Sequence, residues 1–176
     1  EVLERFRDVT ARRADALRAM RAEDLEAPTW TPVGEATYAR FMQIRTFDCW
    51  FHEQDIRDAV GRPGNVDGPA AEEALDEVVR SLGYVVGKLG QAPQGSAVTF
   101  ETTGPVRRTV HVRVDGRATL VDQLDGPADA VISTDSGTFM RLAGGRVDAG
   151  SVRDRLQLSG DVELASRIAA RMGYTI

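Results

Sequence analysis

Three side chains that could bind a metal follow one another at helical spacing in the middle of the chain, namely Asp48, His52 and Asp55. At about 100° per residue they fall on one helix face, together with the apolar residues Phe41, Ile44 and Ala59. The apolar neighbours predict that this face is buried. Carboxylates and an imidazole on a buried face need compensation for their lost hydration. A bound divalent metal would supply it, and so would a structural, hydrogen-bonded Asp–His pair.

Asp48 and His52 are four residues apart, so one metal could take a carboxylate and an imidazole from a single helix. A catalytic zinc usually has three protein ligands, and the third must come from elsewhere. Asp55 could be that ligand, or it could accept a hydrogen bond from His52 and orient the ring. The only other histidine, His111, is expected on a strand and facing away from the core. The pattern alone favours a structural Asp48–His52 pair over a metal site.

Other catalytic motifs are excluded. His52-Glu53 resembles the start of the His-Glu-x-x-His motif of zinc proteases, but position 56 is Ile56. The chain has no P-loop, no dinucleotide-binding glycine pattern and no Gly-x-Ser-x-Gly elbow. Trp50 is expected to serve packing, and Cys49 is expected to be a small packed side chain.

Composition narrows the class of protein. The 176 residues carry a net charge of −5, and the basic residues are scattered, which argues against nucleic-acid binding. No apolar run is long enough to span a membrane. The single cysteine excludes an internal disulfide and fits a reducing cytoplasm. The chain starts at Glu1 within helical periodicity, which predicts a fragment of a longer protein.

Hydrophobic periodicity predicts helices in the first half of the chain and a mostly antiparallel sheet with helices in the second. The expected helices of the first half cover about residues 1–21, 35–60 and 69–89, with a loop near 28–34 that packs over Trp30. After Gly90 the apolar residues recur at every second position, the period of a β-strand. The expected strands lie near 98–102, 110–114, 117–124, 130–132 and 156–158, with helices near 135–143 and 162–172. Asp115-Gly116 is a hairpin turn signal between two of these strands, and Asp161 is the expected N-cap of the last helix. The predicted fold class is α+β in two domains, 1–90 and 91–176.

Two sets of residues resemble a known family. The first is the run Arg45-x2-Asp48-x-Trp50-x-His52-Glu53-Gln54-Asp55-Ile56-Arg57-x-Ala59-x-Gly61-Arg62-Pro63. The second comprises Ala130-Val131-Ile132-Ser133, Phe139-Met140-x-Leu142-Ala143-x-Gly145 and Leu158-x-Gly160-Asp161-x-Glu163-Leu164-Ala165. Both resemble the actinobacterial mycothiol-dependent maleylpyruvate isomerase family. The resemblance implies part of a DinB-like helical bundle over 1–90, followed by a sterol-carrier-protein-like domain over 91–176.

The resemblance also implies a metal site. In this family a divalent metal, usually zinc, is held by an acidic residue, a His four positions later and a His from an earlier helix. The first two correspond to Asp48, where the isomerase has Glu, and to His52. The earlier helix has no counterpart in this chain, so the third ligand is expected from outside it. The missing helices would leave the apolar faces of 1–21 and 35–60 partly uncovered, which predicts association with a second copy or with the missing segment.

The implied function is a cytoplasmic, mycothiol-dependent metalloenzyme acting on a small molecule. Zinc would hold mycothiol as a thiolate, used for maleylpyruvate isomerisation or for thiol transfer. A cation of the C-terminal domain would bind a substrate carboxylate, and Arg107, Arg108 and Arg141 are equal candidates. Two alternatives stay open. One is a non-catalytic small-molecule or lipid-binding protein with a structural Asp48–His52 pair, and the other is a DinB-class protein without turnover.

Overall fold

The computed structural model describes residues 1–174. The chain forms two compact units, Glu1–Arg45 and Thr46–Ile176. Helix α3 (Tyr38–Ala59) begins in the first unit and continues in the second. The predicted division into domains at residue 90 stays a prediction. None of the helices in residues 1–174 combines the length and the apolar character of a membrane span.

The first unit contains helices α1 (Val2–Arg18) and α2 (Ala22–Leu25) and a hairpin of β1 (Pro28–Thr31) and β2 (Gly34–Thr37). The sequence predicted a loop here, because Pro32 and Gly34 dominate the pattern. Pro32 in fact lies in the turn and Gly34 begins β2. Gly34 has a φ of +102°, and the Thr31 hydroxyl donates to the carbonyl of Gly34 over 2.8 Å.

Two predictions about the apolar residues of the first unit have different outcomes. The expected packing of Trp30 is wrong, since its exposed fraction is 75%. A two-stranded hairpin has no second layer to cover an outward side chain. Helix α1 has no buried residue, and Val2, Phe6 and Val9 are exposed. The association expected to cover this apolar face stays a prediction.

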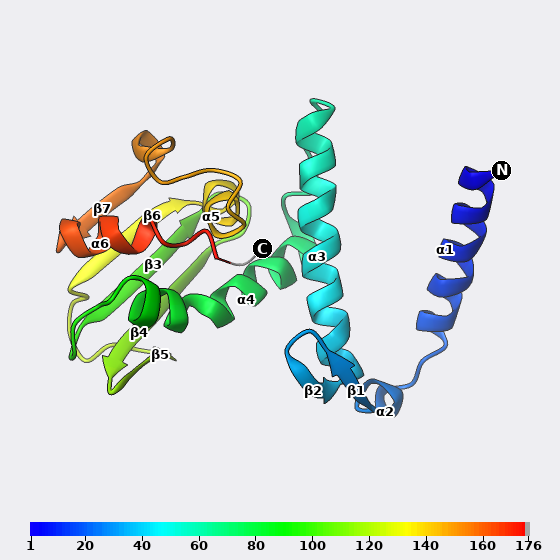
Figure 1. Ribbon diagram of the computed structural model, residues 1–176, viewed down its shortest axis with the longest axis horizontal. Coiled ribbons are helices and arrows are strands. Elements are labelled where there is room, and N and C mark those ends of the chain that lie inside the picture. Colours follow the sequence, from blue (N-terminus) through cyan, green and yellow to red (C-terminus); the bar gives the residue numbers. More distant parts are fainter. Residues whose placement is uncertain (175–176) are drawn as a thin grey trace. The chain divides into compact units, whose positions relative to one another are not determined.

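The second unit is built on a five-stranded sheet in the order β5-β4-β3-β6-β7. The strands are β3 (Ala97–Thr103), β4 (Arg108–Asp115), β5 (Arg117–Val121), β6 (Ala130–Asp135) and β7 (Gln157–Gly160). Only the β3–β6 pair is parallel. Helices α4 (Gly68–Tyr84), α5 (Ser136–Ala143) and α6 (Val162–Ala169) pack on this sheet (Figure 1). The α+β class with a mostly antiparallel sheet is therefore confirmed.

The core of the second unit lies between the sheet and these helices. Val98, Val112 and Ala130 stand side by side in register on neighbouring strands, and all three are fully buried. Helix α4 begins with Pro69 in its first turn. Its buried stripe is Ala71, Ala74, Leu75, Val78 and Leu82, and a π-helical turn, Val85–Leu89, continues it. His111 follows the strand alternation as predicted and lies beside Thr99, with its Nδ1 atom 2.9 Å from the Thr99 hydroxyl oxygen.

Two helices of the second unit begin at aspartate caps that fix their first turns. The Asp135 carboxylate accepts a hydrogen bond from the Thr138 backbone N–H at 2.9 Å, and the Asp161 carboxylate accepts one from the Leu164 N–H at 2.9 Å. Such caps satisfy backbone donors that the helix itself leaves unpaired. The cap at Asp135 places α5 directly after β6, where it carries Met140 and Arg141 toward α3.

Gly160 and Gly116 provide a matched test of backbone constraint in this sheet. Both have positive φ, +72° and +67°, which costs an L-residue about 1 kcal/mol. A Cβ at Gly160 would also overlap the backbone carbonyl of Asp129, whereas one at Gly116 meets open space. Gly160→Ala should therefore lower the free energy of unfolding by about 3 kcal/mol and Gly116→Ala by about 1 kcal/mol. Urea unfolding measures both, and equal losses would contradict the packing argument.

Candidate functional site

The predicted orientation of α3 is wrong. The buried residues of this helix are Phe47, Trp50 and Phe51, whereas Ala59 is exposed and the exposed fraction of the His52 side chain is 60%. Burial of these three large aromatic side chains removes more apolar surface from water than burial of the predicted face with Phe41, Ile44 and Ala59 would. The carboxylates and imidazole on this accessible face therefore need no metal to compensate for lost hydration, and the case for a metal site rests on the distances between their atoms. Cys49 is also exposed, contrary to the prediction that it is packed.

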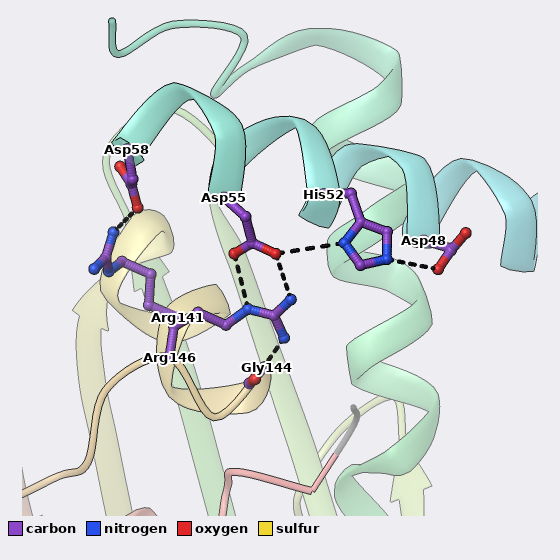
Figure 2. A network of polar contacts seen from close by, with 7 residues as sticks. All are labelled: Asp48, His52, Asp55, Asp58, Arg141, Gly144 and Arg146. Carbon is purple, nitrogen blue, oxygen red and sulfur yellow. Dashed lines mark hydrogen bonds and ion pairs between the residues drawn. The ribbon is translucent and has the colours of Figure 1, made fainter. Parts of the chain in front are cut away.

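The three predicted side chains do come together along α3 (Figure 2). The His52 ring lies between two carboxylates, with Nε2 3.4 Å from Asp48 Oδ1 and Nδ1 3.5 Å from Asp55 Oδ2. Both separations exceed the usual range for an N–H···O hydrogen bond, about 2.7–3.2 Å. The two ring nitrogens thus face different carboxylates, each about one helical turn from His52.

The spacing of Nε2 and Oδ1 suits a shared metal ion. Two zinc bonds of about 2.0–2.1 Å at a tetrahedral angle separate their donor atoms by about 3.3 Å, close to the 3.4 Å found between His52 and Asp48. An imidazole nitrogen and a carboxylate oxygen are both ordinary zinc ligands. Asp48 and His52 therefore fit two positions of a divalent metal site. Residues 1–174 contain no group of three or more His, Cys, Asp or Glu side chains placed to hold a metal.

A residue that sequence reasoning missed, Arg146, completes the network. It donates from Nε to Asp55 Oδ1 at 3.0 Å and from Nη2 to Oδ2 at 2.7 Å, a bidentate pair. Its Nη1 donates to the Gly144 carbonyl at 2.6 Å, and its guanidinium carbon lies 4.9 Å from the centre of the Phe51 ring. The hydrogen bond from Arg146 lowers the pKa of Asp55, and the same bond raises the pKa of Arg146. The only sequence signal was the position of Arg146 after the Gly144-Gly145 helix end.

Gly144 explains how the end of α5 comes this close to α3. A Cβ on Gly144 would overlap the edge of the Phe51 ring. The φ of Gly144 is −79°, which any residue can adopt, so space rather than backbone conformation requires glycine here. The absence of a side chain lets the Gly144 carbonyl reach Arg146 beside the aromatic ring.

A cavity of about 140 Å³ lies next to the network. Its walls are mainly apolar and include Trp50, Val66, Leu75 and Met140. Its polar lining includes Asp55, Asp58, Arg141 and Arg146. The cavity therefore offers an apolar interior with charges of both signs close by.

The structure separates the three arginines that the sequence left as equal candidates for binding a substrate carboxylate. Arg141 lines the cavity and forms an ion pair with Asp58. Arg108 instead pairs with Asp76 on α4 at 3.2 Å, and Arg107 is exposed. Neither of these two residues lines the cavity.

The segment after α3 is held in place by polar side chains of that helix. Trp50 Nε1 donates to the Asn65 carbonyl at 2.9 Å, and the Asn65 amide donates to Glu53 Oε2 at 2.7 Å. Glu53 also pairs with Arg57 at 2.7 Å. These contacts fix the segment that brings Pro63 and Val66 to the cavity wall.

The Asp55–Arg146 pair predicts a pH-dependent contribution to stability. The folded-state pKa of Asp55 is lowered, so the contribution is complete above the unfolded-state pKa of about 3.9 and is lost as the pH falls through the folded-state pKa. Asp55→Asn should lower the free energy of unfolding by about 1 kcal/mol at neutral pH. Urea titrations should show the difference from the unmodified protein vanishing in acid. A difference that persists at low pH would contradict the ion-pair origin.

Comparison with solved structures finds sterol carrier proteins at low identity. Sterol carrier protein 2 from Yarrowia lipolytica, in its apo form, is 13% identical with a TM-score of 0.41 over 57% of this chain and 92% of its own. Sterol carrier protein 2 like 2 from Aedes aegypti is 14% identical with a TM-score of 0.42 over 54% and 93%. Domain 2 of the Helicoverpa armigera sterol carrier protein is 10% identical with a TM-score of 0.40 over 62% and 97%. A comparison with curated proteins gives no match.

Family models match most of the chain. A model described as the MDMPI C-terminal domain matches residues 72–167, more than half of the sequence. A second, described as the mycothiol maleylpyruvate isomerase N-terminal domain, matches residues 1–57 and so includes Asp48, His52 and Asp55. The chain therefore belongs to the mycothiol maleylpyruvate isomerase family.

Proposed function

We propose that this protein acts as a mycothiol-dependent metalloenzyme, with Asp48 and His52 as two ligands of a zinc ion. The observation that carries the proposal is the 3.4 Å separation of His52 Nε2 and Asp48 Oδ1 on an accessible helix face. Membership of the mycothiol maleylpyruvate isomerase family supports the choice of thiol and of reaction. Asp55 would accept a hydrogen bond from the other ring nitrogen of His52.

A zinc ion bound there would stabilise a coordinated thiol as its thiolate near neutral pH. The exposure of His52 leaves room for a thiol cosubstrate to approach. The reaction class would be isomerisation of a carbon–carbon double bond conjugated to a carbonyl. A mycothiol thiolate would add to one carbon while the π electrons move into the enolate, and the resulting single bond would rotate. Collapse of the enolate would expel the same thiolate and restore the double bond. No net oxidation occurs, so no redox partner is needed. Thiol transfer by the same nucleophile is the variant of this proposal.

The cavity is the proposed substrate site, with Arg141 as the group that binds a carboxylate. The side chains of Arg141 and Asp58 are 45% and 52% exposed, so water or an anion can replace one partner of this ion pair at little cost. Arg146 is 21% exposed and already has its donors engaged by Asp55 and Gly144. The apolar wall would cover the carbon skeleton of a small substrate.

The cavity size argues against the alternative of a lipid carrier at this site. Sites for drug-sized ligands usually occupy about 300–1,000 Å³, and this cavity occupies about 140 Å³. A small dicarboxylate-type molecule suits that volume better than a sterol or an acyl chain. A non-catalytic role with a structural Asp48–His52 pair predicts instead that neither residue affects metal affinity.

Zinc affinity, measured by competition with a chromophoric chelator, tests the metal proposal. His52→Ala and Asp48→Ala should each weaken binding by at least about tenfold, because each removes a ligand. His111→Ala is the matched control, since it removes the only other histidine and should leave the affinity unchanged. The proposal is wrong if the unmodified protein binds no zinc, or if the three variants behave alike.

The role of Arg141 is tested by steady-state kinetics with mycothiol and maleylpyruvate. Arg141→Gln should raise KM by about tenfold, because a charge-assisted hydrogen bond to the substrate carboxylate is lost. Asp58→Asn should lower KM, because Asp58 competes for the same guanidinium. Arg108→Gln, which removes an ion pair away from the cavity, should leave KM unchanged. Equal effects of Arg141→Gln and Arg108→Gln would remove Arg141 from the substrate site.

A further inference from the structure

We propose that Arg146 is a positioning residue for the metal site, and that it acts through Asp55 to set the ring orientation and tautomer of His52. This inference deepens the proposed function and rests on it. It links a residue that follows α5 to a metal ligand on α3, with a single carboxylate between them (Figure 2).

The first step is that Arg146 is itself fixed. Its Nη1 donates to the backbone carbonyl of Gly144 at 2.6 Å, its guanidinium carbon lies 4.9 Å from the Phe51 ring centre, and its side chain is only 21% exposed. Phe51 is buried at 3% exposure, so the surface beneath the guanidinium belongs to the core. The guanidinium therefore has a defined position before any ligand binds.

The second step is that Arg146 fixes Asp55. Two parallel hydrogen bonds, 3.0 Å to Oδ1 and 2.7 Å to Oδ2, engage both carboxylate oxygens. A bidentate pair fixes the plane of the carboxylate as well as its distance, which a single point charge does not do. Asp55 therefore presents Oδ2 to its other neighbour in one direction.

The third step carries this constraint to His52. Oδ2 of Asp55 lies 3.5 Å from Nδ1 of the ring, and a carboxylate at that position favours hydrogen on Nδ1. Asp48 Oδ1, 3.4 Å from Nε2, favours hydrogen on Nε2, so the two carboxylates compete unless Asp48 is removed or bound to a metal. The Nδ1–H tautomer has its lone pair on Nε2, where a metal shared with Asp48 Oδ1 would bind. Metal-binding histidines commonly donate their second N–H to a carboxylate in this way. Loss of Arg146 would leave Asp55 free to change rotamer and would remove the preference.

Nitrogen-15 NMR of the zinc-free Asp48→Ala protein, in which the carboxylate beside Nε2 is removed, tests the tautomer at a pH where His52 is neutral. His52→Ala identifies the His52 signals, because the chain has only two histidines. We expect the Nδ1–H form to predominate in Asp48→Ala, and the added substitutions Arg146→Gln and Asp55→Asn each to shift the ring toward the Nε2–H form. Arg108→Gln, which removes another ion pair between two elements, should change nothing. Unchanged tautomer populations when Arg146→Gln is added to Asp48→Ala would overturn the inference.

The variant Arg146→Lys separates the effect of the bidentate hydrogen bonds from the effect of the positive charge. It keeps the positive charge but cannot form the bidentate pair, so we expect its His52 spectrum to follow Arg146→Gln. Measured in the Asp48→Ala background, a spectrum like that of Asp48→Ala alone would show that the positive charge is sufficient and would overturn the role given to the bidentate hydrogen bonds. Circular dichroism of each variant checks that the fold is retained.

A double-mutant cycle on zinc affinity tests whether Arg146 acts through Asp55. Arg146→Gln alone should weaken zinc binding by about tenfold, the lower end of the range for groups that orient a metal ligand. In the Asp55→Asn background the same substitution should have no further effect. Equal losses in both backgrounds would mean that Arg146 acts independently and would contradict the inference. Absence of zinc binding in the unmodified protein would overturn the proposed function, whereas the tautomer measurement would still decide the positioning role.

Discussion

Burial of three aromatic side chains on α3 determines where every polar group of the site points. Phe47, Trp50 and Phe51 occupy successive positions of one helix face, at exposures of 3% to 7%. Their burial leaves Asp48 and His52 on a more accessible face of the same helix. The Phe51 ring also supplies the surface on which Arg146 rests. The polar network is therefore a consequence of apolar packing, with Gly144 providing the space that the approach requires.

The network contributes more to position than to stability. Its carboxylates and its imidazole are partly exposed, and exposed ion pairs are worth only about 0–1 kcal/mol each. Arg146 is the exception, because it is largely buried, bonded on three nitrogens and placed against an aromatic ring. The side chains are therefore progressively less restrained, from the fixed Arg146 guanidinium through the oriented Asp55 carboxylate to the accessible His52 imidazole. Such a gradient suits a site where a ligand must be held in one geometry and still be reached from solvent.

Local sequence patterns predicted most of the elements and the spacing of the candidate ligands. The change of period after Gly90, the Asp115-Gly116 turn and the Asp161 cap all appear in the structure. The rotation of α3 was not predictable in the same way. Two apolar sets at helical spacing compete on this helix, one with Phe41, Ile44 and Ala59 and one with Phe47, Trp50 and Phe51, and only the packing partners decide between them. Arg146 was missed because it lies 91 residues from Asp55 and meets it only through tertiary structure.

Anomalous diffraction at the zinc edge, from crystals of the zinc-loaded protein, tests the central claim most directly. The account predicts a peak within about 2.0–2.2 Å of both His52 Nε2 and an Asp48 carboxylate oxygen, with His52 Nδ1 still facing Asp55. The further ligands would be identified in the same map. A map without a peak at this pair, or a peak bound elsewhere on the chain, would contradict the metal site and leave Asp48 and His52 as a structural pair.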